Sequence, residues 1–152
     1  MLPLNWDQTH TFNFRLTTGG KNWVASAIGK LWSGKPYTPE FKTGTVSGSG
    51  AFAGFADNSE RKPNVFDLDI RASYSINLLG LQSKIYCNIY NLFDLQNEFS
   101  VWEDTGRATY TLLAKDVPLT DPGRIGHLQE HLIRPEWYGE PRRINIGLNI
   151  SL

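Results

Sequence analysis

The last eleven residues of the chain, Arg142 to Leu152, alternate strictly between large aliphatic and small or polar side chains. Because successive side chains of a β-strand point to opposite faces, this segment predicts a strand with one apolar face and one polar face. Eleven residues tilted by about 45° rise roughly 26 Å, close to the ~25 Å apolar band of an outer-membrane barrel. The strands of a soluble sandwich are usually only ~5–6 residues long. We expect the aliphatic set to face lipid: Ile144, Ile146, Leu148, Ile150 and Leu152.

Four further segments share this two-residue period: residues 7–17, 22–33, 64–77 and 84–93. In the first and third, the apolar face carries large side chains that we also expect to face lipid: Phe12, Phe14, Leu16, Phe66, Leu68 and Ile70. The opposite face of the third segment begins with Asp67 and Asp69, charges that a watery lumen accommodates and a packed core does not. In the second segment, Lys30 lies on one face, so we assign the other face, from Trp23 to Leu31, to lipid.

The connections between the five segments alternate in length. In order, they are residues 18–21, 34–62, 78–82 and 94–141. Because antiparallel neighbours alternate in direction, both short turns lie at one end of the sheet and both long connections at the other, as in outer-membrane barrels. Within the last connection, residues 98–102 and 107–112 predict a hairpin that turns at Asp104–Gly106. The sequence therefore predicts an all-β antiparallel meander of about five long transmembrane strands, which forms a partial, unclosed outer-membrane β-barrel.

Composition and charge narrow the class of protein further. The chain carries fifteen basic and fifteen acidic residues, a balance that gives no electrostatic footprint for nucleic acid. No run of residues approaches the roughly 18 consecutive apolar positions of a transmembrane helix. A strand of a membrane barrel needs no such run, because its apolar residues alternate with polar ones. Cys87 is the single cysteine, so it forms no internal disulfide. Residues 1–7 lack the basic start and apolar stretch of a signal peptide, so either the barrel interpretation is wrong or the true N-terminus lies upstream.

Two short motifs match patterns of chemistry that we do not expect here. His127–His131 matches H-x-x-E-H, an inverted zinc-peptidase pattern, but only Pro-rich residues and the terminal strand follow, so we expect a solvated loop turn. The G-x-G within Gly44–Gly54 lacks a following strand–helix unit, which argues against a phosphate cradle. An outer-membrane lipase would need a Ser–His pair, and His10 has no recognisable nucleophile context. We therefore expect no enzymatic activity, catalytic residue, cofactor or metal site.

Four segments, in order along the chain, resemble the C-terminal barrel of TonB-dependent outer-membrane receptors. Leu4–Thr11 is similar to the family's W-D-Q-R-H-T at a strand start, and Ser33–Pro39 is similar to its S-G-x-P-Y-T-P at a strand exit. Asn91–Asp94 resembles the N-L-F-D that ends the penultimate strand, and Asp104–Arg107 resembles a loop hairpin of some members. Order and spacing match along nearly all 152 residues. The family's last residue is often Phe, which the barrel assembly machinery reads, and here it is Leu152.

The resemblance implies that residues 1–152 are the C-terminal fragment of a longer receptor, because family members have a plug domain and about twenty-two strands and this chain has no plug. Five strands cannot close a barrel, since the smallest bacterial examples have about eight. The expected partners are outer-membrane lipid, the missing N-terminal strands and the plug, with TonB and the barrel assembly machinery bound through the full-length protein. The expected location is the outer membrane of a diderm bacterium.

The resemblance also implies TonB-energised uptake of a scarce ligand such as an iron chelate, cobalamin or glycan. Candidate ligand contacts lie in the loops of residues 38–61 and 96–140: Phe55, Trp102, Arg107, Tyr110, Arg134 and Trp137. The alternative hypothesis is a soluble all-β carbohydrate-binding module, in which aromatic residues such as Trp102 and Trp137 stack on sugar rings. The two hypotheses differ in detergent dependence, because the module would be soluble in plain buffer.

Overall fold

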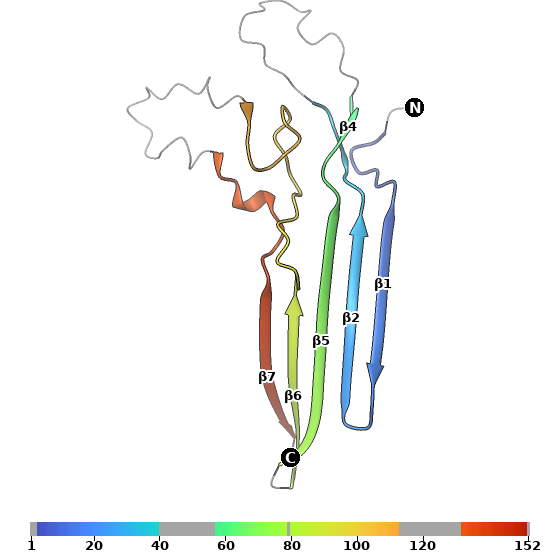
Figure 1. Cartoon of the computed structure of the whole chain (residues 1–152), viewed down its shortest axis with the longest axis vertical. Coiled ribbons are helices and arrows are strands. Elements are labelled where there is room, and N and C mark those ends of the chain that lie inside the picture. Colours follow the sequence, from blue (N-terminus) through green and yellow to red (C-terminus); the bar gives the residue numbers. More distant parts are fainter. Residues whose placement is uncertain (1–2, 40–56, 79, 113–131, 152) are drawn as a thin grey trace, which may run out of the picture. The chain divides into compact units, whose positions relative to one another are not determined.

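The computed structural model describes residues 3–39, 57–78, 80–112 and 132–151. The chain forms two compact units, which we call the sheet unit and the loop unit. The sheet unit contains His10–Trp32, Phe66–Gln96 and Glu140–Leu152; the loop unit contains Met1–Thr9, Ser33–Val65 and Asn97–Gly139. The alternating segments therefore lie in the sheet unit, and the loop unit holds most of each long connection (Figure 1).

Five strands build the sheet: β1 (Thr11–Gly19), β2 (Trp23–Trp32), β5 (Val65–Leu78), β6 (Leu81–Tyr90) and β7 (Arg143–Ser151). They are hydrogen-bonded in the order β1-β2-β5-β6-β7. The pairs β1–β2, β5–β6 and β6–β7 are antiparallel. So is β2–β5, since the Ser75 N–H donates to the Asn22 carbonyl (2.7 Å) near one end, while Lys30 pairs with Asp67 near the other. The predicted all-β antiparallel meander is confirmed, and the described strands form an open sheet.

The register places the apolar side chains of neighbouring strands on one side of the sheet. Directly opposed residues point to the same side. Phe12 lies opposite Leu31, and Ile89 lies between Ile70 and Ile144. The predicted orientation of β2 relative to β1 is therefore correct. We call this side the apolar face, and its large side chains on the two outermost strands are Phe12, Phe14, Leu16, Ile144, Ile146, Leu148 and Ile150.

Glycine occurs inside two strands where an aromatic ring crosses from the neighbouring strand. Phe14 lies opposite Gly29, and its ring fills the space that a Cβ on Gly29 would occupy. Tyr86 covers Gly147 in the same way on the other side of the sheet. A strand glycine marks such a close approach, which explains why the strict alternation of the terminal strand contains a glycine.

The strand boundaries differ from the predicted ones by more than one residue in four places. β1 begins later, at Thr11, and ends later, at Gly19. β6 begins earlier, because the turn before it is tight: Leu78 lies opposite Leu81, and Gly80 takes a φ of 84°, which glycine adopts at little cost. β6 also ends earlier, where Asn91 takes a φ of 49° that no regular strand accommodates.

The loop unit contains only short elements in its described part. β3 (Pro36–Tyr37) pairs with β4 (Glu60–Arg61), a two-residue ribbon that the sequence pattern did not predict. The predicted hairpin of residues 98–112 is wrong, because these residues form no strands, although the chain does turn there: the Gly106 N–H donates to the Trp102 carbonyl (2.8 Å). A 3-10 helix, η2 (Pro135–Trp137), follows. Among the described residues, no helix has the length and apolar character needed to cross a membrane.

Candidate functional site

The apolar face of the sheet is largely exposed on its outer strands. Ile146 is 74% exposed, Leu16 67% and Phe12 60%. The predicted lipid-facing residues of β5, namely Phe66, Leu68 and Ile70, are half-buried, and Leu152 lies outside the described residues. Soluble monomers rarely expose a contiguous apolar patch of more than a few hundred Å². The apolar face is therefore a candidate surface for contact with lipid.

The opposite side of the sheet, which we call the polar face, carries charged and hydrogen-bonding groups. Lys30 Nζ lies 3.8 Å from Asp67 Oδ2 across β2 and β5. The Arg71 guanidinium lies 5.7 Å from the ring centroid of Tyr90, and the Arg143 guanidinium approaches the same ring at 4.7 Å. Cation–π contacts of this kind hold a guanidinium against a ring while it stays hydrated. The predicted charged face thus carries the Lys30–Asp67 ion pair and two arginines that lie over a tyrosine, of which Arg143 also pairs with Glu140 (3.3 Å).

Asn91, the first residue after β6, ties together the ends of three strands. Its side-chain nitrogen donates to the carbonyls of Leu95 and Glu140 (both 3.0 Å), and its Oδ1 accepts from the Leu95 N–H (3.0 Å). Its own N–H donates to Asp69 Oδ1 on β5 (3.2 Å). Asp94 Oδ1 accepts from the N–H that precedes β7 (2.8 Å). This Asn91 corner, made of Asn91 and Asp94, fixes where the second long connection leaves and rejoins the sheet.

An aromatic and cationic group lies in the loop unit, and we call it the tryptophan cluster: Trp102, Arg134 and Trp137. The ring centroids of Trp102 and Trp137 are 4.8 Å apart, with their planes tilted by 58°. The Arg134 guanidinium lies 5.7 Å and 5.9 Å from these two centroids. Trp102 Nε1 and Arg134 Nε are buried donors that meet no acceptor among the described residues. The two half-buried rings and the guanidinium, which also pairs with Glu136 (3.7 Å), suit a ligand with planar or oxygen-rich groups.

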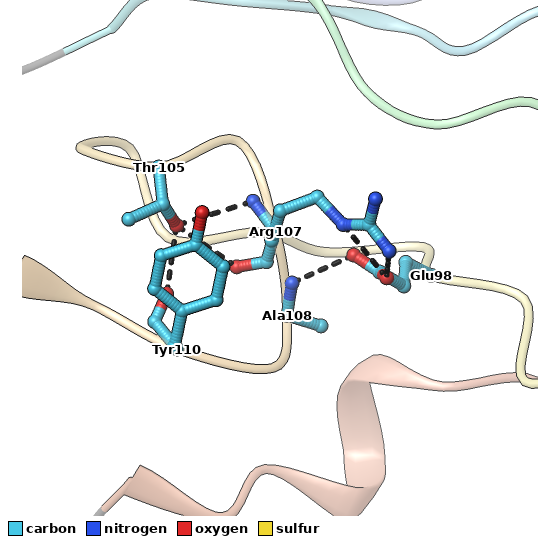
Figure 2. Close-up of polar contacts among 5 residues, drawn as sticks. All are labelled: Glu98, Thr105, Arg107, Ala108 and Tyr110. Carbon is cyan, nitrogen blue, oxygen red and sulfur yellow. Dashed lines mark hydrogen bonds and ion pairs between the residues drawn. The ribbon is translucent and has the colours of Figure 1, made fainter.

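The buried carboxylate of Glu98 binds groups of the loop formed by residues 98–110 (Figure 2). Glu98 is 6% exposed. Its Oε1 accepts from Arg107 Nε (3.1 Å) and Nη2 (2.7 Å), and its Oε2 accepts from the Ala108 N–H (2.7 Å). The Thr105 hydroxyl donates to the Tyr110 carbonyl (2.7 Å) and accepts from the Arg107 N–H (3.3 Å). Charge-assisted bonds to a buried carboxylate are strong, so this set of bonds, which we call the Glu98 clasp, restrains the loop.

The two long connections contact one another inside the loop unit. The Tyr37 hydroxyl occupies the position where a Cβ on Gly106 would lie, and Gly106 has a φ of 66°. Lys62 Nζ donates to the Phe99 carbonyl (3.0 Å). Burial raises the pKa of Tyr37, and the negative charges of Glu60 and Asp104 raise it further. Burial lowers the pKa of Lys62.

The substitution Gly106→Ala is expected to loosen this contact, because the new methyl group collides with Tyr37 and alanine strains the positive φ. The left-handed backbone alone costs about 1–2 kcal/mol. Gly80→Ala is the matched control, since Gly80 also has a positive φ but its Cβ would meet open space. Trypsin cleavage after Arg107 measures the effect. Faster cleavage is expected in the Gly106 variant only, and equal rates in the two variants would contradict the contact.

The raised pKa of Tyr37 makes the loop unit sensitive to alkali. Because the folded state disfavours the phenolate, its stabilisation is present below the ordinary tyrosine pKa of about 10 and is lost as pH rises through the folded-state pKa. Burial also raises the pKa of Tyr138, with the same sign. A titration of tyrosinate absorbance is expected to lose part of its late-titrating component in Tyr37→Phe. An unchanged late component in this variant would contradict the prediction.

The structure gathers most of the sequence-predicted ligand contacts into one unit. Trp102, Arg134 and Trp137 form the tryptophan cluster, and Arg107 belongs to the Glu98 clasp. Tyr110 is 52% exposed, and Phe55 lies outside the described residues, as do residues 44–54 and 127–131. The sequence analysis missed Glu98 and Tyr37. Among the described residues, no group of three or more His, Cys, Asp or Glu side chains is placed to hold a metal ion.

Comparisons of the chain with protein-family models, with curated proteins and with solved structures give no match. The functional interpretation therefore depends on the residues of the chain and on their geometry.

Proposed function

We propose that the chain is part of a TonB-dependent outer-membrane receptor, in which the sheet unit is a sector of the β-barrel and the loop unit contributes to ligand capture outside the cell. The observation that carries the proposal is the division of the sheet into two faces. On β1, β5, β6 and β7 the large aliphatic side chains lie on one side and the charged ones on the other, whereas β2 is mixed, with Val24, Ile28 and Trp32 beside Lys30 on the polar side. A barrel strand between lipid and a watery lumen requires this division.

The exposure of the apolar face supports lipid as its neighbour. The buried hydrophobic residues of the described chain are Val65, Val101 and Ala108, and none of them lies on that face. A soluble sheet of this size gains its stability by covering its apolar side with a second layer. In the proposed barrel, the hydrocarbon chains of lipids cover the apolar face, and water in the lumen solvates Lys30 and Asp67.

The segments that resemble the family's motifs make contacts that hold distant parts of this chain together. Asn91 and Asp94 of the N-L-F-D segment form the Asn91 corner. Tyr37 of the S-G-K-P-Y-T-P segment packs on Gly106 of the D-T-G-R segment. Roles of this kind give a physical reason for the residues on which the resemblance is based, and so support the proposal.

The proposed ligand surface includes the tryptophan cluster, because its two rings lie together under a guanidinium and all three side chains are only half-buried. The ligand classes are those of the family: an iron chelate, cobalamin or a glycan. The remaining barrel strands, the plug, TonB and the assembly machinery are the proposed protein partners. In the proposed receptor, outer-membrane lipid surrounds the apolar face.

Cell fractionation tests the location. An antibody raised against residues 98–112 is expected to detect the chain in detergent-resistant outer membranes of the source bacterium. Detection mainly in a soluble fraction would contradict the proposal.

Spin labelling tests the two faces. In a Cys87→Ser background, nitroxide is attached at Leu148→Cys, on the apolar face, or at Asn149→Cys, on the polar face, and the chain is refolded in detergent micelles. Collisions with oxygen are expected to dominate at position 148, and collisions with a water-soluble nickel chelate at position 149. Equal exposure to the nickel chelate at both positions would overturn the membrane assignment.

A soluble carbohydrate-binding module is the second candidate function, and the Trp102–Trp137 pair is the observation that favours it. Tryptophan faces stack on sugar rings. In that case the chain stays monodisperse without detergent, and oligosaccharides change its tryptophan fluorescence in plain buffer. Aggregation in plain buffer argues for the receptor.

A further inference from the structure

Two buried carboxylates lie in the loop that contains the Glu98 clasp, and they differ in their partners. Glu98 is 6% exposed and binds the Arg107 guanidinium. Asp104 is 7% exposed, and its Oδ2 accepts from the Thr111 hydroxyl (2.7 Å) and the Leu112 N–H (2.6 Å). Its Oδ1 is also buried, and it has no hydrogen-bond partner among the described residues. The charge of Asp104 is therefore held by two neutral donors on one oxygen and by nothing on the other.

The cations of the loop unit that could neutralise Asp104 are engaged elsewhere. Lys62 Nζ donates to the Phe99 carbonyl (3.0 Å). Each described arginine of the unit pairs with another acid: Arg61 with Asp7, Arg107 with Glu98, and Arg134 with Glu136. Burying an ionised carboxylate is costly unless the charge is paired. An orphan oxygen of this kind in a folded protein calls for an ion or a water molecule as its partner.

The surroundings of Asp104 favour an ion, because they add negative potential. The Tyr37 hydroxyl packs against Gly106, two residues after Asp104. Glu60 lies directly opposite Tyr37 across β3 and β4, so the two side chains point to the same side. The negative charges of Glu60 and Asp104 both raise the pKa of Tyr37, so both carboxylates act on this one hydroxyl. A cation bound at Asp104 would therefore be attracted by two carboxylates and would lie near a neutral oxygen.

We infer that the buried Oδ1 of Asp104 is a ligand of a bound calcium ion. Ca²⁺ takes about six to eight oxygen ligands, which include carboxylates, backbone carbonyls and water. Mg²⁺ fits less well, because it keeps its water shell and needs near-ideal octahedral geometry. Such a calcium site does not need three acidic or imidazole side chains, a grouping that the described residues lack. Few charged ligands give weak binding, so we expect a dissociation constant of about 10⁻⁴–10⁻³ M.

The bound ion holds the two long connections together. Asp104 belongs to the second connection, and Tyr37, which packs on it through Gly106, belongs to the first. Neutralising Asp104 removes the repulsion that its charge exerts around Tyr37, so calcium stabilises this contact. The inference goes beyond the proposed function and applies to the soluble alternative as well, because the loop unit is the same in both. Its failure therefore leaves the membrane assignment untouched.

Terbium luminescence tests binding in the full chain, refolded in micelles or, if it is soluble, kept in plain buffer. Tb³⁺ replaces Ca²⁺ in oxygen sites and emits when nearby aromatic rings are excited. We expect emission that Ca²⁺ displaces and Mg²⁺ displaces much less. Asp104→Asn should weaken binding at least about tenfold, since a bond to a charged group is lost. Glu103→Gln is the matched control, because the preceding residue is exposed and loses the same charge. Equal weakening in both variants, or no emission that calcium displaces from the unsubstituted chain, would overturn the inference.

Hydrogen exchange of the Leu112 amide, which donates to Asp104, gives a second readout that needs no variant. Calcium at ten times its dissociation constant should lower the population of the open loop, and with it the exchange rate, about tenfold. A chelator should restore the original rate. In Asp104→Asn, calcium should leave the rate unchanged. If calcium does not slow the exchange in the unsubstituted chain, water rather than an ion is the partner of Asp104, and the inference is wrong.

Discussion

Ile146→Arg is expected to prevent the sheet from inserting into lipid vesicles. Ile146 lies near the middle of β7 on the apolar face and is 74% exposed. A charged side chain at the bilayer midplane of a barrel costs about 2–4 kcal/mol. Since each 1.4 kcal/mol corresponds to a factor of ten, the partition into vesicles should fall by about 30-fold to about 1,000-fold. Flotation of refolded chain with phospholipid vesicles measures this fraction.

Asn145→Arg is the matched control, because Asn145 is the preceding residue of the same strand and belongs to the polar face. In the proposed barrel an arginine there faces the lumen, so flotation should stay close to that of the unsubstituted chain. The soluble alternative predicts another outcome: Ile146→Arg replaces an exposed isoleucine by a charge and raises solubility without loss of structure. Equal flotation of the two variants would remove the support for a lipid-facing side.

Asn91→Ala is expected to be the most destabilising substitution in the sheet unit. Asn91 is 6% exposed, and its side chain makes three hydrogen bonds of 3.0 Å. At about 1 kcal/mol each, their loss costs about 3 kcal/mol. Alanine at the positive φ of this residue adds about 1 kcal/mol. The free energy of unfolding in urea, measured in the micelles used for refolding, checks the total.

Two further variants separate these contributions. Asn91→Gly removes the same hydrogen bonds but tolerates the positive φ, so it should be less destabilising than Asn91→Ala by about 1 kcal/mol. Asn88→Ala, on the polar face of β6, should change the stability by less than about 0.5 kcal/mol. If Asn91→Ala costs no more than Asn88→Ala, the Asn91 corner does not hold the strands together.

The sheet was predictable from the sequence because its signal is local. The two-residue period places all five strands, and Lys30 alone was enough to assign the faces of β2, which the register with β1 confirms. A sheet with one apolar and one polar face requires side chains that alternate along each strand, which makes such strands easy to recognise. Boundaries were less predictable, because they depend on single backbone conformations such as those of Gly80 and Asn91.

The loop unit was less predictable because its contacts join distant residues. The hairpin prediction for residues 98–112 failed because side chains took the backbone donors that a strand ladder would have used. The Ala108 N–H donates to Glu98, and the Leu112 N–H donates to Asp104 (2.6 Å). Such local competition between side chain and backbone disfavours strands. Two of the four aromatic residues chosen from the sequence, Trp102 and Trp137, meet in the tryptophan cluster, but nothing local indicates that Arg134 would lie over both rings.

The order of the strands in the sheet sets the order in which they can assemble. β1 pairs with β2, and β5 with β6, across turns of a few residues, so these hairpins form on the microsecond scale. β7 pairs with β6 only after residues 91–142 close a large loop, an entropic cost that grows by about 0.6 kcal/mol for each doubling of length. We expect β7 to be the last of the five strands to dock, so the nascent chain passes through a stage in which the hydrogen-bonding edge of β6 is open to any competing strand.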